Sequence, residues 1–310
     1  MTASDQMPST ASSPWKMLLP LGAVLLLGLL WSGYWVVASG IAKNRFAEER
    51  AELGRNGLSL ACTQESWGGY PFHFEFLCTS PRFRFEERAE LSSQQLRLTA
   101  LAYAPWQVVA LLDGPSTVSA QGLVPTEAQH GRMIAAVTFG DEGQFPKVSA
   151  ELPSLSIASL AQAEKLMLHT RPSQGGGTDL AMSLTKGVVQ LPDRPPLALA
   201  QADVLARLTP QETLAVERAE LQQGAVRYWG KGEIALDATG RPAGKLDTET
   251  NDVDGLLTLA APPLKMQEDQ VAGLRTMLKL LGSEAKIPLI AKDGVLYLGP
   301  FRVAELPPLR

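Results

Sequence analysis

The feature of this sequence that most constrains its fold is a long run without a charge, MLLPLGAVLLLGLLWSGYWVVASGIA, from Met17 to Ala42. About 20 consecutive apolar residues are enough to cross the hydrocarbon core of a bilayer as a helix. Trp31, Tyr34 and Trp35, near the far end of the run, suit the interface where aromatic side chains gather at membrane surfaces. The run predicts a transmembrane signal-anchor helix over residues 17–40, rather than a buried core helix.

The segments on either side of this run predict how the chain is oriented. Residues 1–16 are polar and lack helical periodicity, which predicts a disordered cytoplasmic tail. A single N-terminal apolar segment commonly directs export of the chain that follows it. Small residues at Val37-Ala38-Ser39 leave open a cleaved export signal, although the run exceeds the core of about 7–15 residues found in such signals.

After the run, the pattern changes twice. Residues 41–57 are rich in charge and end at Gly54 and Gly57, which predicts a helical stalk. Residues 58–310 form a β-rich exported domain of short strands and turns. Apolar Leu96 and Leu98 alternate with polar neighbours, as expected for antiparallel strands that each present one apolar face.

Three further segments near the C-terminus have recognisable patterns. The stretch 238–244, ATGRPAG, and Lys292-Asp293-Gly294 both predict hairpin turns. After Pro262-Pro263, the apolar spacing predicts one amphipathic helix. We expect its apolar side to face the core rather than a membrane surface, because its polar side carries few Lys or Arg. The apolar positions of this helix are Val271, Leu274, Met277, Leu278 and Leu281.

The number of strands predicts the overall architecture. The sequence predicts about a dozen strands with one apolar face each, and one helix to cover them. The fold class is therefore mainly β: an N-terminal transmembrane helix, a large curved antiparallel sheet and one amphipathic α-helix near the C-terminus. The sheet covers itself as a sandwich or barrel, or it curves around an apolar ligand as an open groove.

The stretch WGGYPFHFEFLCTSP, residues 67–81, predicts the first hairpin of this sheet. Cys62 and Cys78 are the two cysteines of the chain, and both lie in the exported part, where disulfides form. A hairpin centred near Tyr70 places Cys62 opposite Cys78, which predicts a disulfide between them. The aromatic candidates for the core or the groove wall are Trp67, Tyr70, Phe72, Phe74 and Phe76.

The sequence offers no combination of residues typical of catalysis. The three histidines lie far apart, and the His73-x-Glu75 pair lacks the further ligands that zinc needs. No GxSxG motif or phosphate-binding loop is present, and the acidic residues between Asp247 and Asp254 do not match a calcium loop. With a net charge of -4 there is no basic field for nucleic acid. We therefore expect no enzyme activity, no metal and no cofactor.

Four passages of the sequence resemble a known family. They are WSGYWVVA (31–38), WGGYPFHFEFLCTSP (67–81), GKGEIALDATGRPAGKL (230–246) and DGVLYLGPFRVAELPPL (293–309). In this order they resemble an uncharacterised bacterial membrane-anchored family, domain of unknown function 2125, which implies no activity or catalytic residues. More distantly, the anchor followed by a GYPF strand resembles AsmA-like envelope proteins, which implies a β-sheet groove linked to lipids.

These observations predict a protein of the bacterial inner membrane, single-pass, with its main domain in the periplasm. The function we expect is non-enzymatic binding of lipid or another apolar ligand by the sheet. The alternative is a structural or scaffold protein of the cell envelope that acts through protein–protein contacts.

Overall fold

A computed structural model describes residues 14–86, 88–120, 124–140, 146–158, 160–173, 176–190, 195–264, 266–281, 286–306 and 308. The helices of this part of the chain are α1 (Pro14–Arg55), α2 (Val253–Leu264) and α3 (Glu268–Leu281). The strands that precede the long central ones are β1 (Leu58–Ala61), β2 (Gln64–Gly68), β3 (His73–Thr79), β4 (Arg82–Phe85), β5 (Ala89–Ser92), β6 (Gln95–Leu101), β7 (Ala104–Asp113), β8 (Ser116–Ala120), β9 (Thr126–Gln129) and β10 (Met133–Thr138). The remaining strands are β11 (Lys147–Ile157), β12 (Ala161–Pro172), β13 (Thr178–Val189), β14 (Leu197–Leu208), β15 (Leu214–Gln223), β16 (Val226–Leu236), β17 (Pro242–Thr250), β18 (Lys286–Lys292), β19 (Val295–Leu298) and β20 (Phe301–Glu305).

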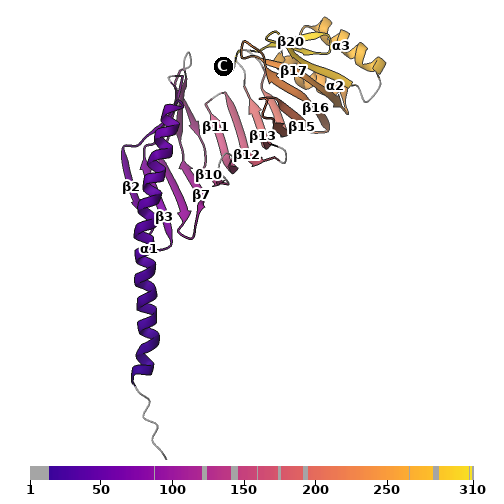
Figure 1. Ribbon diagram of the computed structural model, residues 1–310. Helices are drawn as coiled ribbons and strands as arrows, with labels where there is room; N and C mark the ends of the chain where they lie inside the picture. Colours follow the sequence, from indigo (N-terminus) through magenta and orange to yellow (C-terminus); the bar gives the residue numbers. More distant parts are fainter. Residues whose placement is uncertain are drawn as a thin grey trace, which may run out of the picture.

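All these strands belong to one antiparallel sheet, as the alternating sequence pattern predicts. From β11 to β20, each strand pairs with the strand that follows it in the sequence. Figure 1 shows the sheet as an open, gradually turning layer from β2 beside α1 to β20 beside α3. Within the described residues the strands form no second sheet, so the sheet is neither a sandwich nor a closed barrel.

The first ten strands are the halves of five long strands, each interrupted near its middle. The halves β2, β3, β6, β7 and β10 pair in that order, and so do β1, β4, β5, β8 and β9. The two series meet on β11, which pairs with β10 through its first half and with β9 through its last residues. The whole sheet is therefore a meander in which sequence neighbours are also spatial neighbours.

The interruptions lie next to each other and form a line across the first strands, which we call the crease. Its members are the residues between paired halves: Cys62–Thr63, Ser80–Pro81, Ser93–Gln94, Gly114–Pro115 and His130–Gly131–Arg132. Backbone hydrogen bonds cross it, such as Ser80 N to Gln94 O (2.8 Å) and Gln94 N to Asp113 O (3.2 Å). Although the strands break here, the backbone groups therefore remain paired from one strand to the next.

Helix α1 packs on the beginning of the sheet through its C-terminal half. The ring of Phe46 lies 4.6 Å from that of Phe76 and 5.5 Å from that of Trp67, measured between centroids. Arg50 donates to the carbonyl of Leu60 (Nη2, 2.6 Å) and pairs with Glu65 (2.7 Å). Figure 1 shows the N-terminal half of α1 projecting beyond the sheet.

Helices α2 and α3 cover the other end of the sheet. Their contacts with β18 and β19 bury a cluster made of Leu257, Leu274, Leu278, Ile287 and Leu298. Asp252 precedes α2 and its Oδ1 accepts the backbone N–H of Gly255 (2.9 Å), as a residue at a helix N-terminus does. The described residues thus form one hydrophobic cluster beside α1 and another beneath α2 and α3.

Several boundaries differ from those that the sequence predicts. The helix begins at Pro14 rather than residue 17, and residues 1–13 of the predicted tail lie outside the described part. The predicted helical stalk, residues 41–57, is the C-terminal part of α1 up to Arg55, and it packs on the sheet. The predicted C-terminal helix is α3, and a second helix, α2 (Val253–Leu264), precedes it in a stretch that the sequence analysis assigned to the β-rich domain.

Both predicted hairpin turns are present. Asp293 and Gly294 have φ angles of 54° and 72° and form the two-residue loop between β18 and β19. At the other turn, the Oδ1 atom of Asp237 accepts the backbone N–H groups of Thr239 (2.7 Å) and Arg241 (3.0 Å). The Thr239 hydroxyl also donates to this atom. The hydrogen bond from that hydroxyl is the main cause of the lowered pKa of Asp237, and the backbone hydrogen bonds add to it.

The predicted disulfide is present, but the predicted register of its hairpin is wrong. Cys62 and Cys78 are bonded with their Cα atoms 5.4 Å apart. In the ladder, however, Cys78 lies opposite Glu65, because the turn between β2 and β3 is centred after Pro71 rather than at Tyr70. Cys62 lies before the first residue of β2, at the crease, and its side chain bonds to Cys78 from that position.

Removal of this disulfide tests its contribution to stability. The bond closes a loop with a sequence separation of 16 residues. A constraint on a loop of that size stabilises the folded state by about 3 kcal/mol. We expect the double variant Cys62→Ser/Cys78→Ser to unfold at a lower denaturant concentration than the oxidised protein. Its free energy of unfolding should be lower by about 3 kcal/mol. An unchanged unfolding midpoint would contradict it.

Two leucines of α3 give a matched test of the C-terminal cluster. Leu274 is fully buried in the cluster, whereas Leu280 is 84% exposed. We expect Leu274→Ala to lower the free energy of unfolding by about 2–5 kcal/mol and Leu280→Ala to change it by less than about 0.5 kcal/mol. Denaturant titrations monitored by circular dichroism measure both. Equal effects would mean that α3 does not pack in this orientation.

Candidate functional site

The strand register carries one face of the sheet unbroken from α1 to α2 and α3. Directly opposed residues of antiparallel strands project to the same face, so a chain of paired residues traces a row across the sheet. The central row starts at Phe76, under Phe46 of α1, and ends at Ile287, in the cluster under α2 and α3. Its members are Phe76, Leu98, Ala110, Ala135, Ala150, Leu168, Met182, Val204, Ala219, Gly230, Thr248 and Ile287.

A parallel row lies on each side of the central one. The first consists of Phe74, Ala100, Val108, Val137, Val148, Thr170, Leu180, Ala206, Val216, Gly232, Leu246 and Leu289. The second includes Cys78, Leu96, Leu112 and Met133, and then Leu152, Leu166, Leu184, Ala202, Leu221, Tyr228 and Thr250. None of the residues in the three rows is charged. We call the surface that they form the apolar face.

The apolar face is covered at its two ends and open in its middle. Phe76 is 2% exposed under α1 and Ile287 is 1% exposed under α2 and α3. Between them, on β10 to β16, the buried apolar side chains of these rows are the small Ala206 and Val216. Met182, at the centre of the middle row, is 49% exposed. Most of the other row residues on these strands are half-buried, and a contiguous apolar surface left uncovered in this way marks sites of interaction with an apolar partner.

The polar groups next to the C-terminal cover are hydrogen-bonded within the protein. The Tyr228 hydroxyl donates to Thr248 Oγ1 (2.8 Å), and Thr248 in turn donates to the carbonyl of Ile287. Burial raises the pKa of Tyr228 above its ordinary value. These side chains therefore add little polarity to the end of the apolar face.

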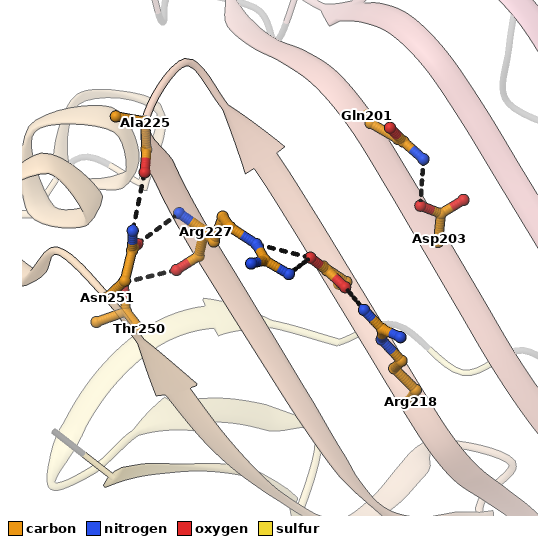
Figure 2. Close-up of polar contacts among 8 residues, drawn as sticks. Gln201, Asp203, Arg218, Ala225, Arg227, Thr250 and Asn251 are labelled. Atoms are coloured by element: carbon orange, nitrogen blue, oxygen red, sulfur yellow. Dashed lines mark hydrogen bonds and ion pairs between the residues drawn. The ribbon is translucent and has the colours of Figure 1, made fainter. Parts of the chain in front are cut away.

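The opposite face of the same strands carries a ladder of ion pairs. On β15 and β16, Glu220 accepts from Arg227 (Nε, 2.9 Å) and from Arg218, as Figure 2 shows. The hydrogen bond from Arg227 is the main cause of the lowered pKa of Glu220, and the hydrogen bond from Arg218 is the second. Asp179 on β13 pairs with Arg207 on β14 (2.8 Å) and with Arg171 on β12 (3.2 Å). The hydrogen bond from Arg207 is the main cause of the lowered pKa of Asp179.

Figure 2 also shows the polar contacts beside this ladder, at the end of β17. Asn251 accepts the backbone N–H of Arg227 (2.7 Å) and donates to the carbonyl of Ala225 (2.9 Å). Thr250 donates to the carbonyl of Arg227 (2.9 Å). These bonds fix the turn at which β17 passes into α2, so the charged face and the C-terminal cover are held in one orientation.

The aromatic residues that the sequence predicts as core or groove candidates separate into two groups. Phe74 and Phe76 are buried on the apolar face, and Trp67 packs against Phe76 with ring centroids 5.1 Å apart. Tyr70 and Phe72 are not in the core, because they lie in the turn between β2 and β3 and are exposed.

The predicted apolar positions of the C-terminal helix face the cluster. Leu274 and Leu278 are buried, and Val271 and Met277 pack beside them. The side chain of Leu281 lies outside the described residues.

The residues most suggestive of chemistry are dispersed. His73 Nε2 lies 4.0 Å from Glu75, which also lies 3.9 Å from Arg97, on a partly exposed strand surface. In the acidic stretch, Asp247 pairs with Lys245 and Asp254 with Arg275, each at 2.7 Å. Among the described residues no group of three or more His, Cys, Asp or Glu side chains is placed to hold a metal ion.

One Ser–His contact at the crease escaped the sequence analysis. Ser116 Oγ lies 2.8 Å from His130 Nε2 and 2.9 Å from Ser93 Oγ, and His130 Nδ1 lies 2.6 Å from the carbonyl of Gly131. Serine beside histidine is the pair that nucleophilic catalysis uses. Ser116, however, is only 3% exposed, and its bonds join three neighbouring strands. The geometry fits a role in holding the crease together.

The apolar face itself has no local sequence signal. Each strand contributes only two or three apolar residues to it, such as Leu166 and Leu168 on β12 and Leu180, Met182 and Leu184 on β13. Strand alternation predicts that these residues share a face within one strand. The register between strands, which joins them into rows, follows from the structure alone.

Comparison with known proteins identifies the family. Residues 35–307 match the model of a family described as an uncharacterized protein conserved in bacteria, DUF2125. No curated protein and no solved structure is significantly similar to the chain. The match begins within α1 and ends after β20, so it includes both covers of the apolar face and all its rows. The chain therefore belongs to the DUF2125 family of bacterial proteins.

Proposed function

We propose that this protein is a non-enzymatic envelope protein, anchored in the bacterial inner membrane by α1, whose periplasmic sheet binds lipid through its apolar face. The observation that carries the proposal is the open middle of the apolar face, from β10 to β16, between the two covered ends. We call this open part the strip. A monomer in water rarely leaves such a surface exposed, because covering it is favourable by about 25 cal/mol for each Å² of apolar area.

The dimensions of the strip suit an acyl chain. From β10 to β16 the rows cross six strand spacings of about 4.8 Å each, which gives about 29 Å. One leaflet of a bilayer is about 15 Å thick in its hydrocarbon part, so the strip exceeds the length of a lipid tail. Each methylene group that leaves water for the strip contributes about 0.8 kcal/mol.

The membrane helix supports lipid as the occupant. Among the described residues, α1 is the helix long and apolar enough to cross a membrane, and its span is not covered by the rest of the chain. Its C-terminal half packs on the same face that the rows occupy, through Phe46 against Phe76. The apolar face thus begins beside the helix that would bring it to a lipid source.

Photocrosslinking in intact cells tests the identity of the occupant. A benzoylphenylalanine is placed at Met182, on the apolar face, or at Ala181, which precedes it and faces the other side. We expect mass spectrometry to find a phospholipid adduct at position 182 and none at position 181. A protein adduct at position 182 would favour the scaffold function instead. Lipid adducts at both positions, or none at either, would contradict the proposal.

A charged substitution tests the binding itself. Because Met182 is half-exposed, Met182→Glu leaves folding intact but places a carboxylate in the strip. We expect lipid co-purifying with the full-length protein to fall several-fold for Met182→Glu, and to be unchanged for Ser183→Glu on the charged face. Lipid extraction with mass spectrometry measures this, and a melting curve checks the fold. Unchanged lipid in a folded Met182→Glu variant would overturn the proposal.

A further inference from the structure

The end of the sheet that lies beside the apolar half of α1 carries exposed aromatic side chains. They come from the turn before β3, the turn between β6 and β7, the start of β7 and the residue after β10. Each is 52–63% exposed: Tyr70, Phe72, Tyr103, Trp106 and Phe139. The first strands of an antiparallel meander bring these positions to one end of the sheet, and the backbone N–H of Phe139 donates to the carbonyl of Trp106 (2.9 Å). We call this set the aromatic end.

Three side chains of helix α1 donate hydrogen bonds to the backbone of the aromatic end. Trp31 Nε1 donates to the carbonyl of Pro71 (2.8 Å), and Trp35 Nε1 donates to that of His73 (3.1 Å). Tyr34 donates to the carbonyl of Ala102 (2.7 Å). Three side chains on neighbouring turns of the helix therefore satisfy backbone carbonyls in both turns of the sheet.

The same stretch of α1 lies at the end of its membrane-spanning run. Counted from Met17, the about 20 residues that cross the hydrocarbon core end at Val36. Trp31 and Trp35 lie inside the last two turns of this span, where aromatic side chains occupy the interface. The carbonyls to which they are bonded must lie at the same depth.

Two of the turns at the aromatic end are uncharged. The turns 68–72 and 101–106, at the aromatic end, contain no Asp, Glu, Lys or Arg. At the opposite end of the same strands, the turn between β4 and β5 carries Glu86 and Arg88, whose side chains form an ion pair (3.2 Å). Uncharged turns that carry exposed aromatic side chains are what an interface with a bilayer favours.

We propose that the aromatic end is a membrane-docking surface, seated in the interfacial layer of the bilayer that α1 spans. The sheet then rests directly on the membrane instead of being held above it by a stalk. Val108 on β7 and Val137 on β10 are paired in one row of the apolar face, and they lie two residues from Trp106 and Phe139 of the docked end. A lipid tail would therefore pass from the leaflet to the sheet without crossing water. The proposal rests on the anchoring of α1 given under the proposed function.

Depth measurements on the full-length protein in phospholipid nanodiscs test this surface. Both cysteines of the chain are in the disulfide, so single cysteines can be labelled with an environment-sensitive nitrobenzoxadiazole dye. The test variants are Phe72→Cys, Tyr103→Cys and Phe139→Cys. The matched control is Phe85→Cys, an exposed aromatic position at the opposite end of the same strands. A further variant, Leu25→Cys, reports whether α1 is in the membrane.

Quenching by lipids with a nitroxide near the headgroup gives the result. We expect quenching at positions 72, 103 and 139 to exceed that at position 85 several-fold, with position 25 quenched by nitroxides deep in the bilayer. Quenching at position 25 with positions 72, 103 and 139 as unquenched as position 85 would overturn the docking surface and leave the anchor standing. Absence of deep quenching at position 25 would overturn the anchor, and the docking surface with it.

Discussion

The antiparallel pairing of each strand with its sequence neighbours is the interaction on which the rest of this structure depends. It keeps opposed residues on one face over the whole sheet, from Phe76 to Ile287. A slip of one residue between any two strands would move every later row to the other face. Because the register holds, α1 and the pair α2 and α3 cover opposite ends of the same face, and the charges collect on the other.

Local irregularities are absorbed without loss of this register. At the crease five long strands break, yet hydrogen bonds of the backbone, the disulfide and the Ser93–Ser116–His130 contacts continue across the breaks. Between β14 and β15 a bulge near Leu205 and Ala206 takes up one residue, and Ala219 returns to the central row. Bulges of this kind increase local twist and bend the strand, which suits a sheet that turns along its length.

The two faces of the central strands meet different requirements. The charged face is satisfied by its own ion pairs, such as Arg207 with Asp179 and Arg227 with Glu220. Among the described residues the apolar face has no such internal partner between its covers, since one layer of sheet has no second layer to pack against. A ligand with acyl chains would supply the missing layer, which is why the proposed function follows from the architecture rather than from a cluster of reactive groups.

The sequence by itself determined the elements whose signals are local. The charge-free run predicted the long apolar helix α1, strand alternation predicted the antiparallel sheet, and Asp293-Gly294 predicted its hairpin. Helix α2 was missed because Leu256, Leu257 and Leu259 fit a short strand as well as a helix, although Asp252 offered an N-terminal signal. The disulfide was predicted, but its register was not, since the centre of the turn depends on pairing beyond the hairpin. Only the tertiary structure decided which apolar residues form one surface, because rows arise from register between strands. It also decided that Tyr70 and Phe72 are exposed at the aromatic end, because that depends on where α1 lies against the sheet.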